Sequence, residues 1–460
     1  IQDLPDDRRP LKFNLKWDEA EQSRAKVQYF IAQSVLQAAV EAAANGVKRE
    51  NLTFNFSYPE AYSHDHLRSF RRITRRAVNV GLGDEKYKSQ EKIGFETESV
   101  SSALYFAKGQ EIPFTENVVT IDIGGGTSDL SIWQDTKLLW RNSFRLAGKD
   151  VLINHLTNNL TLIKVISGND DLLLESYQTL QSIRSNKAKL ANGIELLVNS
   201  PQFGEAFKNR FEIFSGQEKG KELKDLTELA LSGILYYVSQ VLNHLIENGE
   251  FQKGSGKSKS LRICLGGKAS TLYKIVFEDS DDQEGLSKMI EKATGGIFNS
   301  IGIVFTDAPK HEVSYGLLVD KAGATDLDLT DRSHETVLGE DVVVGKEKIG
   351  TVSGLNKVID KPWRIKDINQ LKKFLDLLKS TSKIRINPTK KFEGDLEGKI
   401  NAELKNGQAR AQDLKKDMQS VEGEDSLAEI QKTSSIIEPL FIQALKQVIK
   451  EITNGKLKIK

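Results

Sequence analysis

The chain has 460 residues, of which 28% are charged and 38% hydrophobic, and its formal net charge is +1. This balance excludes the strong global field that attracts nucleic acid or an anionic membrane, so we expect neither partner. A single cysteine excludes a disulfide framework and favours a reducing compartment such as the cytoplasm. No apolar run approaches the roughly 20 residues that span a bilayer.

The length suggests about three domains. The chain opens with "IQDLPDDRRP", which has neither a Met nor a signal-peptide core. We therefore expect a fragment, a processed chain or the ordered part of a longer protein.

The first third of the chain predicts alternating helices and strands after an irregular segment over residues 1–24. Helical spacing of apolar residues runs through "SRAKVQYFIAQSVLQAAVEAAANG". The stretch "LTFNFSYP" alternates like a strand and stops at Pro59. "HDHLRSFRRITRRAVNVG" predicts a basic amphipathic helix, and "SVSSALYFAKG" predicts a short helix of small residues.

The rest of the chain predicts a sheet, then a long helical region, and then a C-terminal region of different composition. "VVTIDIGGGTSDLSIW" predicts a strand, a turn and a strand, and "TKLLWRNSFRL" continues the sheet. A helix is expected after Gly148, mainly helical structure from about 170 to 248, and a buried strand at "LRICLGG". Beyond Lys321 we expect polar sequence with one short strand and two amphipathic helices, near 368–378 and 437–452.

The glycine-rich turn carries the clearest chemistry in the sequence. Its three glycines are Gly124, Gly125 and Gly126. Without side chains they let backbone N–H groups approach an anion closely, and Thr127 adds a hydroxyl donor. Asp122 and Asp129 bracket the turn and offer the oxygen ligands that Mg²⁺ prefers. A plain glycine hairpin is the alternative, although a hairpin requires no aspartate on either side.

The stretch "IDIGGGTSDLSI" resembles the second phosphate-binding motif of the actin-like ATPase superfamily, which includes the seventy-kilodalton heat-shock chaperones, actin, its bacterial relatives and sugar kinases. Other stretches resemble further family motifs in family order: "FSYPEAYSHDHLRSFRRITRRAVNVGL", "ETESVSSALYFAKG", "LAGKDVLINHL", "IRSNKAKLA", "ICLGGKAS" and "APKHEVSYGLLVD". The resemblance covers about residues 25 to 321. It is stronger to the chaperones and bacterial actin-like proteins than to the sugar kinases.

The resemblance implies an α/β fold, the actin-like ATPase fold of two ribonuclease-H-like domains, with an extra α-rich C-terminal segment. Residues 25–117 correspond to the second part of the first domain. Residues 118–321 correspond to the second domain, with a helical subdomain near 160–250. Residues 322–460 form the α-rich C-terminal region, which does not resemble the β-rich peptide-binding domain of the chaperones.

One family motif has no match. The first phosphate motif, an aspartate–glycine–threonine turn, does not occur before Asp122. The three strands that carry it are expected upstream of Ile1 or elsewhere in the chain. Without them the strand at 52–56 keeps an unpaired edge. "GEDVVVGKEKIGTVSG" is rich in strand formers and glycine but has no aspartate in the right place.

The resemblance implies that ATP and Mg²⁺ bind in a cleft between two domains. It implies catalytic roles for Glu98, Asp122 and Thr127, with Glu98 orienting the water that attacks the γ-phosphate. Asp122 and Asp129 are implied to position Mg²⁺ and its waters. The implied nucleotide-binding residues are Gly124, Gly125, Gly126, Thr127, Lys187, Gly266 and Gly267.

Three positions depart from the family pattern, and one further position matches it. Ser99 stands where the chaperones have proline, Arg184 where an acidic residue is common, and Lys268 where serine is usual. These departures put the nucleotide contacts of Arg184 and the hydroxyl contacts at Lys268 in doubt. Gly316 falls on the family's close contact between two connecting helices.

The implied function is an ATP-binding and ATP-hydrolysing chaperone-like or regulatory protein. Hydrolysis is conditional on the missing phosphate motif. The alternatives are a filament-forming actin-like protein and a degenerate nucleotide-binding scaffold without turnover. The expected partners are ATP or ADP and a protein bound through the C-terminal region.

Other candidate sites favour structural interpretations. "GSGKSKS" lacks the full spacing of a phosphate loop and precedes a strand, so we expect a solvated connector. His64 and His66 have no third metal ligand nearby in sequence. The arginines of the basic helix are expected on a solvated face, with an acidic partner as the alternative. Cys264 lies in an apolar strand and is expected in the core.

Overall fold

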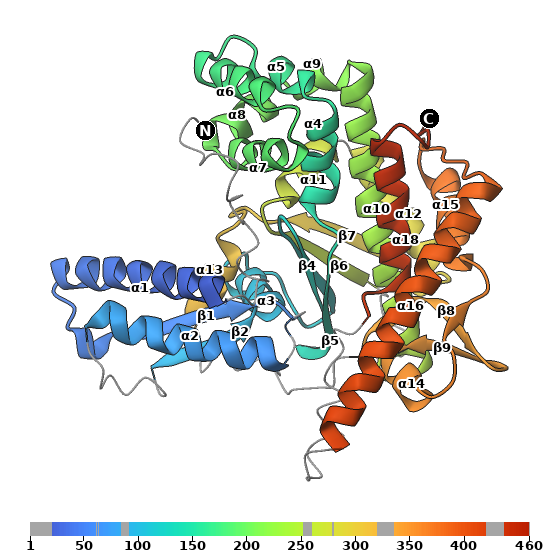
Figure 1. Cartoon of the computed structure of the whole chain (residues 1–460), viewed down its shortest axis with the longest axis horizontal. Coiled ribbons are helices and arrows are strands. Elements are labelled where there is room, and N and C mark those ends of the chain that lie inside the picture. Colours follow the sequence, from blue (N-terminus) through green and yellow to red (C-terminus); the bar gives the residue numbers. More distant parts are fainter. Residues whose placement is uncertain are drawn as a thin grey trace.

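The computed structural model describes residues 21–60, 62, 64–83, 92–251, 260–277, 280–319, 335–419 and 437–459 (Figure 1). Most of the expected irregular N-terminal segment, the connector at 252–259 and the polar stretch at 320–334 lie outside these residues. The described chain has mixed α/β structure with three sheets.

A small N-terminal lobe, residues 21–97, contains two helices and two strands. Its elements are α1 (Glu21–Ala44), a 3₁₀ turn (Arg49–Asn51), β1 (Phe54–Tyr58), α2 (His64–Leu82) and β2 (Ile93–Thr97). Helix α1 therefore begins inside the segment 1–24 that we expected to be irregular. The lobe has its own hydrophobic cluster, in which Val35, Val78 and Ile93 are buried. Strand β1 pairs in parallel with β2, and within the described residues it has no other strand partner.

A five-stranded sheet forms the centre of the molecule. Its strands are β3 (Asn117–Ile123), β4 (Ser128–Gln134), β5 (Lys137–Phe144), β6 (Ser260–Gly266) and β7 (Ser300–Phe305). The spatial order is β5-β4-β3-β6-β7, with β3, β4 and β5 antiparallel and β3, β6 and β7 parallel. The predicted strand–turn–strand and the "LRICLGG" strand are confirmed. The described residues hold one such sheet, so the pair of equivalent domains stays a prediction.

Two helices lie between the small lobe and the central sheet (Figure 1). They are α3 (Glu98–Lys108), which the sequence predicted, and α13 (Glu312–Leu318). A Cβ atom on Gly316 would lie 1.7 Å from the carbonyl oxygen of Ser101. Only a residue without a side chain permits this approach, so the predicted close helix contact at Gly316 is confirmed.

Helices fill the region from 149 to 247. After a π-helical turn (Lys149–Ile153) come α4 (Asn154–Asn158), α5 (Thr161–Ser167), α6 (Asp171–Ser182), α7 (Lys187–Val198), α8 (Pro201–Asn209), α9 (Phe211–Ser215) and α10 (Glu218–Glu247). By length and composition α10 could cross a membrane, but 83% of its apolar window is buried inside the protein. That burial accounts for its apolar character as a core helix. Helices α11 (Ser270–Val276) and α12 (Ser280–Ala293) follow β6.

The C-terminal region contains more strand than we expected. Its elements are β8 (Val337–Val344), β9 (Glu347–Thr351), α14 (Val352–Lys357), β10 (Arg364–Ile365), α15 (Asn369–Thr381), α16 (Lys390–Gln419) and α18 (Leu440–Thr453). Strands β10, β8 and β9 form a separate antiparallel sheet. The expectation of one short strand was therefore wrong, and β8 and β9 do not extend the β1–β2 sheet.

The C-terminal region shares its core with the central sheet and the helices around it. One cluster of buried residues runs from β3 and α10 to α15 and α18. Gly233 of α10 faces Leu445 of α18, and a Cβ atom on Gly233 would lie 2.1 Å from that leucine side chain. The missing side chain thus lets α18 pack directly against α10. We call this whole unit, residues 117–459 apart from α13, the large lobe.

Candidate nucleotide site

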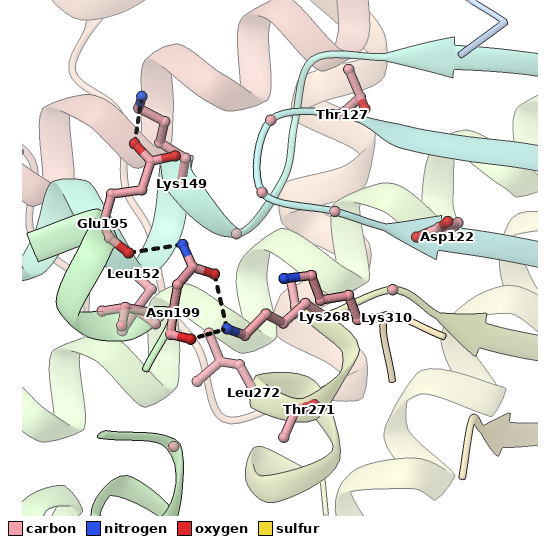
Figure 2. A pocket seen from close by; sticks show the side chains of 18 of the residues that line it. Asp122, Thr127, Lys149, Leu152, Glu195, Asn199, Lys268, Thr271, Leu272 and Lys310 are labelled. Atoms are coloured by element: carbon pink, nitrogen blue, oxygen red, sulfur yellow. Dashed lines mark hydrogen bonds and ion pairs between the residues drawn. The ribbon is translucent and has the colours of Figure 1, made fainter. Parts of the chain in front are cut away.

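A cavity of about 620 Å³ lies where the parallel strands of the central sheet end (Figure 2). Strands β3, β6 and β7 run in the same direction, so their carboxyl ends meet at one edge. The loops after these three strands all line the cavity. Sheets with parallel strands bind ligands at this edge, where loops from different strands converge. The order and direction of these strands therefore determine where the candidate site lies.

The turn after β3 is held in shape by backbone hydrogen bonds. The N–H of Gly124 donates to the Thr127 carbonyl at 2.9 Å. The N–H groups of Gly148 and Lys149 donate to the carbonyls of Gly124 and Gly125, at 3.1 and 2.9 Å. The carbonyls of Gly124 and Gly125 are therefore turned toward the following segment.

The tip of the turn is open toward the cavity. A Cβ atom on Gly125 or Gly126 would meet nothing within 4 Å. Within the described residues, the N–H groups of these two glycines donate no hydrogen bond. Adjacent N–H groups with free space in front of them form a concave site suited to an anion.

Two carboxylates stand at the base of the turn. Asp122 of β3 pairs in register with Asp129 of β4, so both side chains lie on the same side of the sheet. Asp122 is 9% exposed and Asp129 is 2% exposed, and the Thr127 hydroxyl donates to Asp129 Oδ2 at 3.3 Å. Like charges directly opposite one another are destabilising, and a divalent cation offsets that repulsion.

These carboxylates fit Mg²⁺ better than a metal that needs an all-protein cage. No group of three or more His, Cys, Asp or Glu side chains suited to a metal occurs in the described parts of the chain. Mg²⁺ is usually bound by one or two carboxylates, with water and phosphate oxygens completing its shell. Asp122 and Asp129 both line the cavity and provide this minimal protein contribution.

The segment after β6 comes very close to the base of the turn. Gly267 has φ +81°, and a Cβ atom there would lie 2.2 Å from Asp122 Oδ1. Its N–H donates to Oε1 of Glu312, the first residue of α13. Gly267 lines the cavity, whereas Gly266 lies behind it, against Glu312 and Ser102. Burial raises the pKa of Glu312, and the hydrogen bond from Gly267 opposes that rise.

The far side of the cavity is formed by α7 and α8. The ammonium of Lys149 lies 3.3 Å from Oε2 of Glu195 on α7. Apolar side chains cover the wall beyond these polar groups: Leu152, Val198, Phe203, Phe207, Leu272 and Ile275. The cavity thus has a polar end at the glycine turn and an apolar end between the helices.

The structure does not bring Lys187 to the cavity. Lys187 is the exposed first residue of α7, whereas the residues of this helix that line the cavity, Glu195 and Val198, lie in its last turn. At 1.5 Å per residue, Lys187 is about 16 Å along the helix axis from Val198. Sequence similarity identified the helix but not the end that reaches the site.

Glu98 reaches the cavity from the small-lobe side. It is the first residue of α3, whose N-cap Thr97 accepts a hydrogen bond from the Val100 N–H at 3.4 Å. Glu98 and Ser57 line the cavity together. Behind them, Arg141 of the large lobe forms an ion pair of 3.2 Å with the buried Glu60 of the small lobe. The two lobes are therefore linked next to the site.

The sequence interpretation missed several cavity residues. Lys310 and Glu312 follow β7, a strand we did not predict, and Asn199 directly follows α7. Lys149, Lys310 and Glu312 lie in stretches that resemble family motifs, but the resemblance gave these residues no role. Lys268 was noted only as a departure from the family's serine. For Lys268, Lys310 and Glu312 the signal is their position after a strand, which identifies such residues once the strand order is known.

Comparison with known proteins adds little information about the function of this chain. No protein-family model matches the chain, and no curated protein matches it in sequence. Among solved structures, the ethanolamine utilization protein EutJ from Carboxydothermus hydrogenoformans is similar over 63% of this chain and 73% of that chain. The sequences are 13% identical and the TM-score is 0.30. A TM-score this low carries no argument, so the site rests on its own geometry.

Proposed function

We propose that the chain binds ATP with Mg²⁺ in this cavity and hydrolyses the terminal phosphoanhydride bond. The observation that carries the proposal is the convergence of separate sequence motifs on one cavity. Glu98, the turn Gly124–Thr127 and Gly267 come from three distant segments, and all of them line it. Chance placement of a glycine hairpin would not produce this arrangement.

The two ends of the cavity support a nucleotide as the ligand. The open N–H groups of Gly125 and Gly126 suit phosphate oxygens. The apolar wall of Phe203, Phe207 and Leu272 suits a nucleobase, which has an apolar face and a polar edge. A volume of about 620 Å³ lies within the range of sites for ligands of this size.

In the proposed reaction, Glu98 orients a water molecule toward the γ-phosphorus. The water oxygen forms a bond to phosphorus as the bond to the bridging oxygen breaks, which leaves ADP and inorganic phosphate. Asp122 and Asp129 would hold Mg²⁺ through its water shell, and the bound ion would offset phosphate charge. The protein's contribution is then positioning and charge stabilisation, because phosphoryl transfer asks little covalent chemistry of side chains.

Steady-state phosphate release by the Glu98→Gln variant tests the reaction. We expect a loss of about 100-fold relative to wild type, with ATP affinity nearly unchanged, because the glutamine keeps the shape but not the charge. Glu175→Gln, an exposed position on α6, is the matched control and should release phosphate like wild type. Phosphate release by Glu98→Gln equal to wild type would remove Glu98 from the mechanism.

We also propose that the C-terminal region responds to the nucleotide. Lys446 of α18 lies 3.9 Å from Asp150, which directly follows the cavity residue Lys149. A shift of the glycine turn on nucleotide binding would pass to α18 through this contact. A regulatory or chaperone-like switch would use this route, whereas a passive scaffold would not need it. Protease digestion with ATP and with ADP tests it: different cleavage patterns are expected, and identical patterns would indicate a scaffold.

A further inference from the structure

Two lysines stand side by side at the ends of neighbouring strands. Lys268 directly follows Gly267 after β6, and Lys310 lies in the turn between β7 and α13 with φ +78°. Both line the cavity, and Figure 2 shows both side chains extending into it beneath the glycine turn. Neither was assigned a role by the sequence motifs.

Within the described residues, neither ammonium group forms an ion pair with a carboxylate. The Lys268 ammonium donates to the Asn199 carbonyl at 3.1 Å and to Asn199 Oδ1 at 2.8 Å, both of which are neutral. The Lys310 ammonium forms no hydrogen bond or ion pair with any described residue. Lys149, the third lysine of the cavity, differs because Glu195 neutralises it.

Holding the ammonium groups of Lys268 and Lys310 close together costs free energy unless an anion is bound between them. Burial lowers the pKa of Lys268, and the positive charge of Lys310 lowers it further. Two cations close together in a partly enclosed cavity repel one another more strongly than in water. A bound anion with several negative charges would reverse the sign of this interaction. The neighbouring Glu312 does not fill that role, because it is fully buried and accepts the N–H of Gly267.

We infer that Lys268 and Lys310 bind the phosphate groups of a nucleoside di- or triphosphate from the side opposite the glycine turn. The phosphates would lie between the N–H groups of Gly125 and Gly126 and the two ammonium groups. This inference rests on the proposed nucleotide site and names the residues that supply its positive charge. It also gives a reason for lysine at position 268, where the family resemblance expects serine.

Equilibrium binding of ATP, ADP and adenosine to the full chain, with Mg²⁺ present, tests the inference. Lys268→Gln and Lys310→Gln should each weaken ATP and ADP binding by about tenfold, the usual effect of one charged hydrogen bond. Adenosine has no phosphate, so its Kd should not change. Lys310→Arg retains the charge and should bind ATP nearly like wild type. Lys274→Gln, at an exposed position of α11, is the matched control.

The outcomes separate the two proposals. No binding of ATP to wild type would overturn the proposed function itself. Binding of ATP to both glutamine variants within twofold of wild type would overturn only the role of the lysines. Equal losses for ATP and adenosine would also overturn it, because the lysines would then shape the pocket rather than contact phosphate. Circular dichroism of each variant identifies any that does not fold, and the other glutamine variant then decides the question.

Discussion

The two lobes of the molecule differ in how completely they bury their sheets. The large lobe has a five-stranded and a three-stranded sheet, covering helices and one continuous core that includes the C-terminal helices. The small lobe has two parallel strands and a separate cluster of a few buried residues. Parallel strands are normally covered on both faces, and two strands alone are marginally stable. The residues that line the cavity come mainly from the large lobe, and the small lobe contributes Ser57 beside the linking residue Glu98.

The largest contrast is expected between two glycines that both have a positive φ. Gly267 in the large lobe and Gly46 in the small lobe have φ +81° and +75°. A Cβ atom on Gly267 would meet Asp122 and Ile123 within 2.4 Å, whereas one on Gly46 would meet nothing within 4 Å. Gly267→Ala should cost about 3 kcal/mol or more in unfolding free energy and abolish ATP binding, and Gly46→Ala about 1 kcal/mol. Urea denaturation measures both, and similar costs would contradict the packing described around Asp122.

A second test concerns the shared core of the large lobe. Leu445 of α18 is fully buried against α10. Leu445→Ala should lower the unfolding free energy by about 3 kcal/mol and shift the transition of the whole large lobe. Leu36→Ala, on the exposed face of α1, should change it by no more than about 0.5 kcal/mol. A separate early transition of the C-terminal region in calorimetry would show that it is an independent domain.

A third test breaks the link between the lobes. Arg141→Gln leaves the buried carboxylate of Glu60 without its ion-pair partner, since the side chains of the pair are only 13% and 6% exposed. We expect a cost of about 2 kcal/mol, concentrated in the small lobe, with faster hydrogen exchange in β1 and β2. The exposed Arg72→Gln on α2 should leave exchange unchanged. Unchanged exchange in Arg141→Gln would mean that the small lobe does not depend on this contact.

The smallest expected effect is a pH dependence within the large lobe. The imidazole of His244 on α10, 3.6 Å from Oε2 of Glu335, lowers the pKa of Glu335 to about 2. Because the folded pKa lies below the ordinary value of 4.5, this stabilisation is present above pH 4.5 and is lost as pH falls toward 2. In His244→Gln, unfolding free energy measured from pH 5 to pH 3 should fall less steeply than in wild type. Parallel pH profiles would contradict the assignment.

The sequence predicted local elements well because their signals are local. The glycine turn and helix α3 each depend on residues within a few positions of one another. The close approach of Gly316 to Ser101 joins distant segments, and the family resemblance rather than a local pattern predicted it. Strand β7 was missed because most of its residues are only half-buried or exposed, so its pattern is not that of a buried strand. Strand β10 has two residues, too few for any periodic pattern.

The cavity could be predicted only in part, because it is assembled from distant segments. Strand order decides that Lys310 and Glu312 lie beside Gly267, and no spacing in the sequence encodes that order. Lys187 is the opposite case, because it was expected at the cavity and lies away from it. The resemblance pointed to its helix, α7, and the last turn of α7 lines the cavity, but tertiary packing places Lys187 at the other end.

The affinity of Mg²⁺-bound ATP for wild type and for two Gly125 variants tests the central claim most directly. A Cβ atom at Gly125 meets nothing within 4 Å, so the fold should tolerate either variant. Gly125→Asp and Gly125→Asn have side chains of nearly equal size and differ in charge. We expect ATP to bind wild type at one saturable site. We expect Gly125→Asp to bind ATP at least about tenfold more weakly than Gly125→Asn, because the added carboxylate repels phosphate. Equal affinities for the two variants, or no saturable binding to wild type, would contradict a phosphate site at the glycine turn.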